Sequence, residues 1–206
     1  MRVLVACEFS GIVRDAFLAK GHDAWSCDLL PTESPGPHIQ GDVLKILNDG
    51  WDLMIAHPPC QYLSYAGVAH WNKPGRLEKR LQALHFFAEL WLAPIEKICI
   101  ENPKGCASPT ISKYNQMIQP WFFGDKQNKP TWLWLKGLSL LSWDKDRAIK
   151  PQAVYYQMTG KQRGRRRYQI DSALGCSEDF FQVGDRYRNR SVFPKGIAKA
   201  MAEQWG

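Results

Sequence analysis

Residues 57–64, His-Pro-Pro-Cys-Gln-Tyr-Leu-Ser, present a cysteine directly after an apolar run that predicts a buried strand. The two prolines forbid continuation of strand or helix and stiffen the loop that carries Cys60. A nearby cation or helix N-terminus lowers a thiol pKa from about 8.5 and yields a nucleophilic thiolate. We therefore take Cys60 as a candidate nucleophile, whereas Cys7, Cys27 and Cys99 lie in or beside predicted strands and are expected to be small buried residues.

Glu101 is a second candidate, because it ends the apolar strand predicted at residues 98–100 and precedes Asn102 and Pro103. Desolvation at such a strand end raises the pKa of a carboxyl group and lets it donate or share a proton. The alternative for an isolated glutamate is a helix cap or a surface charge.

A Phe-Ser-Gly turn at residues 9–11 follows the first predicted strand and opens a helix predicted at residues 12–20. Glycine lets the backbone approach a ligand closely, and the helix N-terminus presents free amide groups. A helix-capping turn would have the same sequence. Asp28, about 20 residues further on, stands where nucleoside-binding α/β folds place the carboxylate that holds ribose hydroxyls.

Strands and helices alternate through the first 120 residues, which predicts a parallel sheet covered by helices on both faces. Such sheets bind ligands beyond the carboxyl ends of their strands, so the candidate residues are expected to converge on one rim. Apolar residues at three- and four-residue steps predict the buried face of the longest helix. They are Leu77, Leu81, Leu84, Ala88 and Leu92.

The pattern changes after residue 120. Alternation at residues 131–135, Thr-Trp-Leu-Trp-Leu, predicts β structure. A last helix is expected from Pro194, a favourable first-turn residue, through Ile197, Ala198, Met201 and Ala202. A chain of 206 residues is expected to form one domain.

The positive charge is concentrated at one end of the chain. Residues 1–144 carry 14 Lys and Arg against 14 Asp and Glu, and residues 145–206 carry 13 against 6, which is the whole net charge of +7. Five of these cations fall within residues 161–167. A polyanion such as nucleic acid is the natural partner, and a solvated basic loop without a specific ligand is the alternative.

Composition excludes several classes of protein. A hydrophobic content of 45% with 12% aromatic residues excludes a disordered chain. The N-terminal apolar run is too short for a signal peptide, and no segment approaches the roughly 20 apolar residues of a membrane span. We expect a cytoplasmic protein without a membrane partner. The six cysteines lack a CxxC pair, which argues against disulfides and a metal site.

Taken in order, the motifs resemble those of the cytosine carbon-5 DNA methyltransferases. They are Glu-Phe-Ser-Gly at residues 8–11, Asp28, Gly-Asp-Val at 41–43, Pro-Pro-Cys-Gln-Tyr-Leu-Ser-Tyr-Ala-Gly at 58–67 and Glu-Asn-Pro-Lys-Gly at 101–105. In that family Pro-Cys-Gln is followed at fixed spacing by Ser-x-Ala-Gly, as it is here. The resemblance implies an α/β class chain with a Rossmann-like S-adenosylmethionine-dependent methyltransferase fold and a small basic C-terminal extension. It is closest in kind to a small, phage- or prophage-like member, acting in a bacterial or phage-infected host cell.

The resemblance also implies residue roles. Cys60 would add to carbon 6 of a flipped-out cytosine while Glu101 protonates ring nitrogen 3, and carbon 5 would then accept the methyl group of S-adenosylmethionine. The implied cofactor-binding residues are Phe9, Ser10, Gly11, Asp28, Asp42 and Pro59. The expected substrate contacts are Gln61, Ser64, Asn102, Gln127, Lys129, Arg166 and Arg167.

Two motifs depart from the family pattern. The second glycine of the first turn is Val13 here. The family's Gln-x-Arg-x-Arg segment corresponds to residues 127–131, which keep Gln127 and one cation but lack the paired arginines. Arg163 and Arg165, in another such string, are rival candidates to assist catalysis at the cytosine carbonyl. The same string can instead contact phosphates, which we favour.

Three regions are expected: a cofactor-binding and catalytic core at residues 1–144, an abbreviated basic nucleic-acid-contacting region at 145–187, and a C-terminal helix at 188–206 that packs back on the core. Family members insert a sizeable target-recognition domain where only about 50 residues separate Leu138 from Arg188. The alternatives to DNA methylation are therefore the same chemistry on a cytidine nucleotide or single strand, transfer of a larger one-carbon-derived group, or a non-catalytic nucleic-acid-binding subunit.

Overall fold

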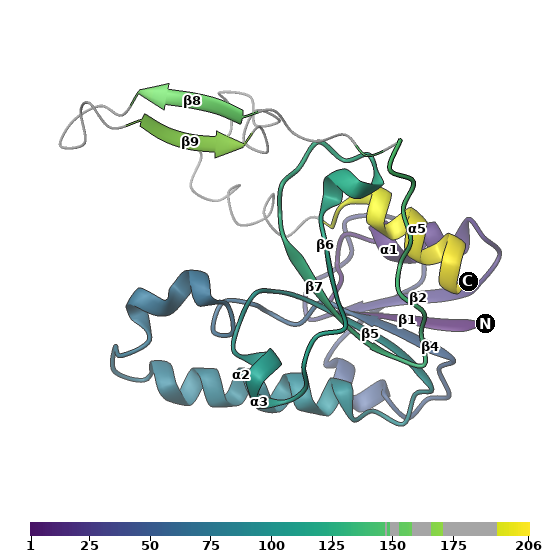
Figure 1. The fold of residues 1–206 in the computed structure, drawn as a ribbon. Coiled ribbons are helices and arrows are strands. Elements are labelled where there is room, and N and C mark those ends of the chain that lie inside the picture. Colours follow the sequence, from purple (N-terminus) through teal and green to yellow (C-terminus); the bar gives the residue numbers. More distant parts are fainter. Residues whose placement is uncertain (147, 149–152, 158–165, 171–192) are drawn as a thin grey trace.

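The computed structural model describes residues 1–146, 148, 153–157, 166–170 and 193–206, and its centre is a seven-stranded sheet of order β3-β2-β1-β4-β5-β7-β6 (Figure 1). The strands are β1 (Arg2–Ala6), β2 (Asp23–Asp28), β3 (His38–Gln40), β4 (Leu53–Ala56), β5 (Lys97–Pro103), β6 (Gln116–Ile118) and β7 (Thr131–Lys136). The helices are α1 (Ile12–Leu18), α2 (Arg76–Trp91), α3 (Ala107–Thr110) and α5 (Lys195–Trp205). Short 3-10 turns are η1 (Val43–Ile46), η2 (Tyr65–His70) and η3 (Pro120–Phe123).

The sheet confirms the predicted α/β class and Rossmann-like arrangement. β3, β2, β1, β4 and β5 pair in parallel, and their order is the 3-2-1-4-5 order of doubly wound sheets. The central strands β1 and β4 are continuous apolar runs because both of their faces are covered. The sheet is mixed rather than wholly parallel, since β7 lies between β5 and β6 and is antiparallel to both.

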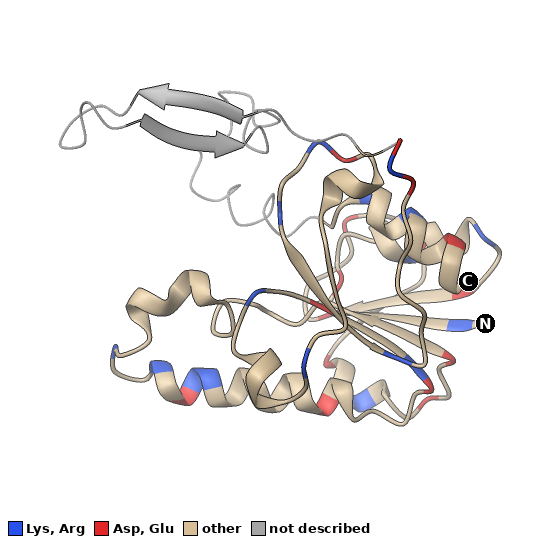
Figure 2. Cartoon of the chain, viewed as in Figure 1, with Lys and Arg blue, Asp and Glu red and all other residues tan. Residues whose placement is uncertain are grey.

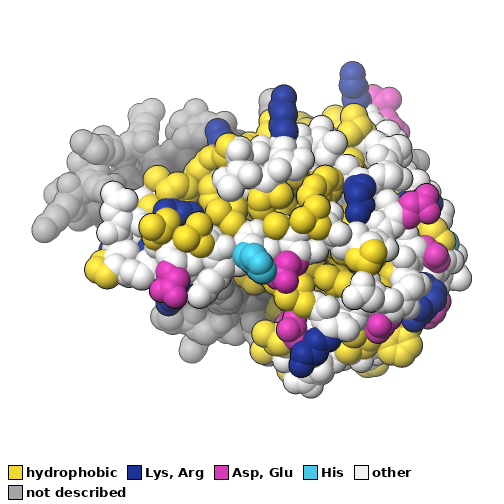
Figure 3. Space-filling model, turned by 90° about the horizontal axis from the view of Figure 1, so that it is seen from below, with side chains coloured by type: hydrophobic (Ala, Val, Ile, Leu, Met, Phe, Trp, Pro, Cys, Tyr) yellow, Lys and Arg dark blue, Asp and Glu magenta, His cyan; other side chains and the backbone are white. Residues whose placement is uncertain are grey.

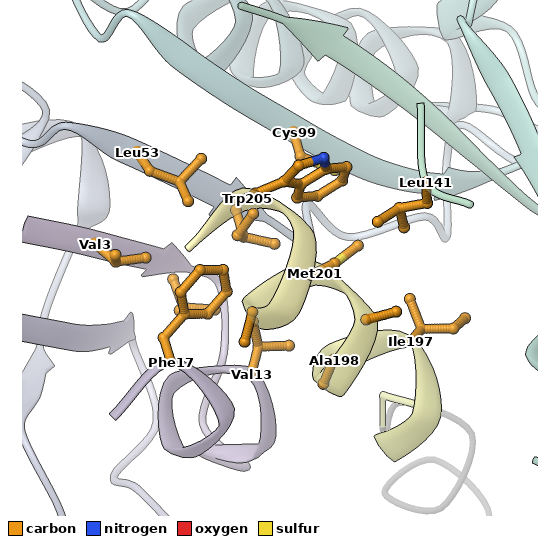
Figure 4. Packing of buried hydrophobic residues seen from close by; sticks show 14 of the residues in the cluster. Val3, Val13, Phe17, Leu53, Cys99, Leu141, Ile197, Ala198, Met201 and Trp205 are labelled. Carbon is orange, nitrogen blue, oxygen red and sulfur yellow. The ribbon is translucent and has the colours of Figure 1, made fainter. Parts of the chain in front are cut away.

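One face of the sheet is covered by α1 and the C-terminal helix α5 (Figure 4). Ile197, Ala198 and Met201 of α5 are buried, and they pack with Phe17 of α1 in one apolar cluster. The predicted last helix is confirmed, with Pro194 as its N-cap. The C-terminal segment therefore lies on the core of the domain.

The opposite face is covered by the second half of α2, and here the predicted burial was wrong. Phe87 and Leu90 are buried, and the Phe87 ring meets the Trp134 ring edge-on with centroids 5.0 Å apart. Leu77 and Leu81 are each 57% exposed, and Leu92 is 77% exposed. The first half of α2 projects beyond the sheet, so the regular leucine spacing has no partner to pack against (Figure 1).

A separate two-stranded antiparallel ladder joins β8 (Ala153–Gln157) and β9 (Arg166–Ile170). The cationic residues Arg166 and Arg167 lie on β9. In the part of the chain that the structure describes, no helix is long and apolar enough to cross a membrane.

Candidate functional site

The candidate residues gather at the edge of the sheet where β1, β2, β4 and β5 end. Backbone hydrogen bonds join the chain segments that follow these strands: the His57 N–H donates to the Ala6 carbonyl at 2.9 Å and the Gly41 N–H to the Asp28 carbonyl at 2.9 Å. Parallel strands place their carboxyl ends together, so the rim expected from the sequence is formed by the topology itself.

The turn after β1 is held by Glu8, a buried residue that sequence reasoning did not single out. Its carboxylate accepts from the Val13 N–H at 2.7 Å, the Arg14 N–H at 3.2 Å and the Ser10 hydroxyl at 3.3 Å. The expectation that α1 presents free amides to a ligand was therefore wrong, because the chain's own carboxylate occupies them. Gly11 adopts the left-handed φ of 76° that the turn requires.

Asp28, at the end of β2, and Asp42, directly before η1, supply two carboxylates to this half of the rim. Asp28 accepts from the Leu30 N–H at 2.9 Å and Asp42 from the Leu44 N–H at 3.1 Å, each through Oδ1. No hydrogen bond within the described residues engages either Oδ2, which leaves that oxygen for a ligand. Among the same residues, no group of three or more His, Cys, Asp or Glu could hold a metal ion.

Two thiols at the strand ends lie close enough to these carboxylates for the negative charges to raise their pKa values. Burial, followed by the negative charges of Asp28 and Asp42, raises the pKa of Cys27 to about 11. Burial and the same two carboxylates also raise the pKa of Cys7 above its ordinary value. Cys7 is the non-glycine residue of the described chain with a left-handed backbone, at φ 59°. Both thiols stay protonated at neutral pH and belong to the scaffold.

The loop that carries Cys60 turns back on itself directly after the two prolines. The Cys60 carbonyl accepts from the N–H groups of Leu63 at 3.1 Å and Ser64 at 2.9 Å. The Ser64 hydroxyl caps η2 by accepting from the Ala66 N–H at 3.1 Å. The loop is thus locally ordered, and Cys60 lies at its exposed tip.

A clamp fastens this loop to the segment that follows Glu101. Asn102 is buried, and its side-chain amide donates to the Pro58 carbonyl at 2.8 Å. The Cys106 N–H donates to the Leu63 carbonyl at 2.9 Å. A side chain at Gly105 would meet that same carbonyl, so only glycine permits this approach. The predicted substrate residue Asn102 therefore lies behind the loop and positions it.

The surroundings of Cys60 do not make it a resting thiolate. Its surface is exposed, yet enough protein lies around the sulfur that burial raises the thiol pKa, and the Glu101 carboxylate raises it further. Lys129 and a hydrogen bond within the loop act in the opposite direction without reversing the shift. The expected activation by a nearby cation is present but outweighed.

Glu101 shows the opposite shift from the one expected. Burial alone pushes its pKa up, but a hydrogen bond from His57, the charge of Lys129 and a hydrogen bond from Thr131 together bring it below the ordinary value. The distance from His57 Nδ1 to Glu101 Oε2 is 3.5 Å. Glu101 is therefore a buried carboxylate at neutral pH, although it is only 7% exposed.

His57 is a site residue that sequence reasoning passed over, although it begins the quoted loop. Its ring centroid lies 4.5 Å from that of Phe193, in the segment before α5. Within the described residues, His57 Nε2 and Asn102 Oδ1 are buried without a hydrogen-bond partner. The position of His57 directly after a buried strand was the available signal.

The remaining predicted site residues are less closely tied to Cys60. Gln61 and Gln127 are exposed, and Pro59 lines a hollow of about 320 Å³ with Tyr62, Lys79, Gln82, Ala83 and Phe86. Phe9 and Ser10 are half-buried at the first turn. Arg163 and Arg165 lie outside the described residues, and only the backbone of Arg166 and Arg167 is described.

A basic arm, residues 62–82, projects from the sheet beside the Cys60 loop (Figure 2). It comprises η2 and the first half of α2, and it holds four Lys and Arg against one Glu. The Arg76 guanidinium lies 4.6 Å and the Lys79 ammonium 5.7 Å from the Tyr62 ring centroid. Arg80 lies 4.3 Å from the Trp71 ring. Cations and aromatic rings interleave along this arm, as they do on nucleic-acid-binding surfaces.

The same arm exposes apolar side chains. Val68 is 58% exposed, close to the values for Leu77 and Leu81 one turn apart on α2. Hydrophobic side chains gather over the lower side of the molecule, where α2 lies (Figure 3). The arm is therefore both cationic and apolar.

Comparisons with known proteins give structural likeness only. No family model and no curated protein matches the sequence. An E. coli protein described as a DNA modification methyltransferase encoded within a prophage superposes with a TM-score of 0.43 at 15% identity, covering 68% of this chain and 49% of its own. The S. pombe Dnmt2 methyltransferase superposes with a TM-score of 0.46 at 20% identity, covering 71% and 54%. The chain spans about half the length of each of these structures.

Proposed function

We propose that this protein transfers a methyl group from S-adenosylmethionine to carbon 5 of cytosine in DNA, through a covalent bond between Cys60 and carbon 6. The observation that carries the proposal is the pairing of Cys60 with Glu101. The two residues are far apart in sequence, yet the clamp joins their loops and Lys129 acts on both. A nucleophile beside a proton donor is what addition across the carbon 5–carbon 6 bond needs.

The steps follow from these two groups. The Cys60 thiolate forms a bond to carbon 6 while Glu101 gives a proton to nitrogen 3, so electron density builds up at carbon 5. S-adenosylmethionine would supply the electrophilic methyl group. Water then takes the carbon 5 proton, the carbon 5–carbon 6 double bond re-forms, the sulfur–carbon 6 bond breaks to release the Cys60 thiolate, and nitrogen 3 returns its proton to Glu101. The target base must leave the duplex to reach this rim, at a cost of about a few kcal/mol.

The cofactor half of the rim suits a nucleoside but not a bound anion. Asp28 and Asp42 offer acceptors for ribose hydroxyls and an adenine amine, and Gly11 keeps the turn open. Glu8 already fills the helix N-terminus with negative charge, which disfavours a phosphate and is compatible with a sulfonium cation. We propose that Phe9, Ser10 and Pro59 complete this site.

DNA is the proposed partner because the chain carries two groups of cations. The arm supplies one group, and the proposed nucleic-acid-contacting region, residues 145–187, supplies Arg163, Arg165, Arg166 and Arg167. Gln61, Ser64, Gln127 and Lys129 would contact the strand near the target base. The proposed core is residues 1–144, with residues 188–206 returning to it.

The test is a covalent trap. Incubation with S-adenosylmethionine and an oligonucleotide containing 5-fluorocytosine should give a denaturant-stable adduct. Fluorine replaces the carbon 5 proton whose loss would release Cys60, so the covalent intermediate persists. Cys60→Ser should give none, and Cys106→Ser, a matched change of a buried cysteine in the clamp, should keep it. An adduct that survives Cys60→Ser would falsify the assignment.

The choice of substrate needs a second measurement. The basic arm favours a polymer, so methyl incorporation should be greatest with duplex DNA, lower with a single strand and lowest with a cytidine nucleotide. Equal rates for the nucleotide would assign the activity to free nucleotides. Salt-dependent DNA binding without cofactor binding or methylation would identify a non-catalytic subunit.

A further inference from the structure

We propose that His57 is the proton carrier that loads Glu101, through its Nδ1, for protonation of the substrate ring. The inference rests on the proposed function, since it assigns the source of the proton that Glu101 delivers. It adds a residue to the site that the motifs do not include.

The fold holds the His57 ring in one place. Its backbone N–H donates to the Ala6 carbonyl, which fixes the residue at the end of β4. The ring packs on Phe193 at 4.5 Å, and the side chain is only 12% exposed. Nδ1 therefore lies 3.5 Å from Glu101 Oε2, and little of either side chain is exposed to solvent.

The resting protons are on the wrong partners for the reaction. The surroundings keep Glu101 as a carboxylate, while Cys60 keeps its proton as a thiol. Addition to cytosine needs the reverse, a thiolate and a carboxylic acid. Cys60 is exposed and can lose its proton to solvent, but the buried Glu101 must receive one from a neighbour.

The charged and titratable groups around the pair leave one donor. Lys129 faces Glu101 from the loop before β7, and an ammonium group is a weak acid near neutral pH. Burial, and after it the charge of Glu101, raises the pKa of Cys99 on β5, so this thiol does not donate. Thr131 offers only a hydroxyl. Histidine alone among these groups exchanges a proton near neutral pH.

The transfer balances. The His57 imidazolium gives its Nδ1 proton to Glu101 Oε2, and neutral imidazole keeps the proton on Nε2. Glu101 passes that proton to nitrogen 3 as the sulfur–carbon 6 bond forms. When Cys60 leaves, nitrogen 3 returns the proton to Glu101 and thence to His57. Nε2 is buried without a partner among the described residues, and an unpaired polar atom of this kind needs an explanation such as a catalytic role.

The test compares His57→Gln with a matched pair elsewhere. His85→Gln is the control, because His85 Nδ1 lies 3.1 Å from Glu89 on the exposed side of α2. His57→Gln should slow adduct formation roughly 100-fold without weakening cofactor binding. The wild-type rate should fall as His57 loses its proton with rising pH, and that limb of the pH profile should vanish in the variant. Imidazole added to His57→Gly should restore part of the rate.

Two outcomes overturn the relay: a His57→Gln rate and pH profile like those of wild type, or a folded His57→Gly that imidazole does not rescue. If the variants fail to fold, carbon-13 NMR of wild-type Glu101 decides, since its carboxyl signal must change over the same pH range as the ring signals of His57. That titration needs no activity. A wild-type protein that forms no 5-fluorocytosine adduct would instead refute the proposed function, whether or not the titrations are coupled.

Discussion

The two halves of the rim differ in how completely their buried polar groups are paired. In the half beside β1 and β2, the fully buried Arg14 guanidinium is surrounded by acceptors. They are Asp15 Oδ1, the hydroxyls of Ser26 and Thr32, and the carbonyls of Ser34 and Pro35. In the half beside β4 and β5, His57 Nε2 and Asn102 Oδ1 lack partners within the described chain.

This difference distinguishes residues that hold the fold in place from residues that take part in the proposed reaction. A fully paired buried network stiffens its surroundings and fixes one geometry, here the loop between β2 and β3 against α1. An unpaired polar atom costs stability and persists where a ligand or a reaction uses it. We interpret the Arg14 half as a rigid seat for the cofactor and the His57 half as the place where protons move.

The largest expected effect tests the support role. Arg14→Met keeps the length of the side chain but leaves its acceptors unpaired. Hydrogen bonds to a charged group contribute about 1.5–3 kcal/mol each, so the free energy of unfolding should fall by roughly 3 kcal/mol or more. Urea denaturation measures it. Lys20→Met is the control, because Lys20 forms an exposed ion pair with Glu203 and should cost at most about 1 kcal/mol. Equal losses would mean that the Arg14 network contributes no more to stability than a surface ion pair.

The arrangement of elements was predictable from sequence, because it follows from local pattern. The buried runs of β1 and β4, the turn at Gly11 and the apolar face of α5 each fix their element without distant information. The buried face of α2 was not predictable in this way. Its leucine spacing is regular, but Leu77 and Leu81 in the first half of the helix are exposed, and spacing alone cannot show that no element packs against them.

The chemistry of the site was only half predictable. The motifs identify Cys60 and Glu101, but the directions of both pKa shifts depend on residues brought in from far along the chain. His57 is 44 positions from Glu101, and Lys129 reaches both groups from a third segment. The burial of Glu101 predicts a raised pKa. The hydrogen bonds from His57 and Thr131 and the charge of Lys129, which only the fold supplies, reverse that shift.

A smaller effect is the pH dependence of the free energy of unfolding, to which Cys27 and Glu101 contribute at opposite ends of the pH range. Unfolded thiols ionise at about 8.5, whereas folded Cys27 ionises at about 11, so ionisation of the unfolded chain destabilises the fold as pH rises through that window. The free energy of unfolding should fall there by at most about 1.4 kcal/mol per pH unit for each such thiol. Glu101, with a lowered pKa, acts at the other end, and its stabilisation is lost below about pH 4.3.

Replacement of the thiols gives the measurement. Cys7→Ser and Cys27→Ser together should flatten the decline in stability between about pH 8.5 and 11, followed by urea denaturation at each pH. Cys60→Ser, at an exposed tip, should change the slope less. A larger change for Cys60→Ser than for the double replacement would contradict the assignment of this decline to Cys7 and Cys27.

The smallest expected effect concerns DNA binding by the basic arm, which belongs to neither half of the rim. Lys79→Ala should lower the slope of log K against log salt by about 0.9 for duplex DNA, because one phosphate contact and its released counterions are lost. Fluorescence anisotropy with a labelled duplex at several salt concentrations measures the slope. Lys45→Ala, an exposed lysine of η1 outside the arm, should leave it unchanged.

The exposed apolar side chains of the arm should affect DNA affinity without changing its salt dependence. Leu77→Ser removes an exposed side chain without removing charge, so it should weaken binding by a similar factor at every salt concentration and leave the slope intact. A duplex must open before its bases meet an apolar surface, and a single strand is already open. The loss should therefore be smaller for a single strand if Leu77 helps to open the duplex. Equal losses of affinity for both substrates would assign Leu77 to ordinary base contact. No loss of affinity for either would mean that the arm contacts only the phosphates.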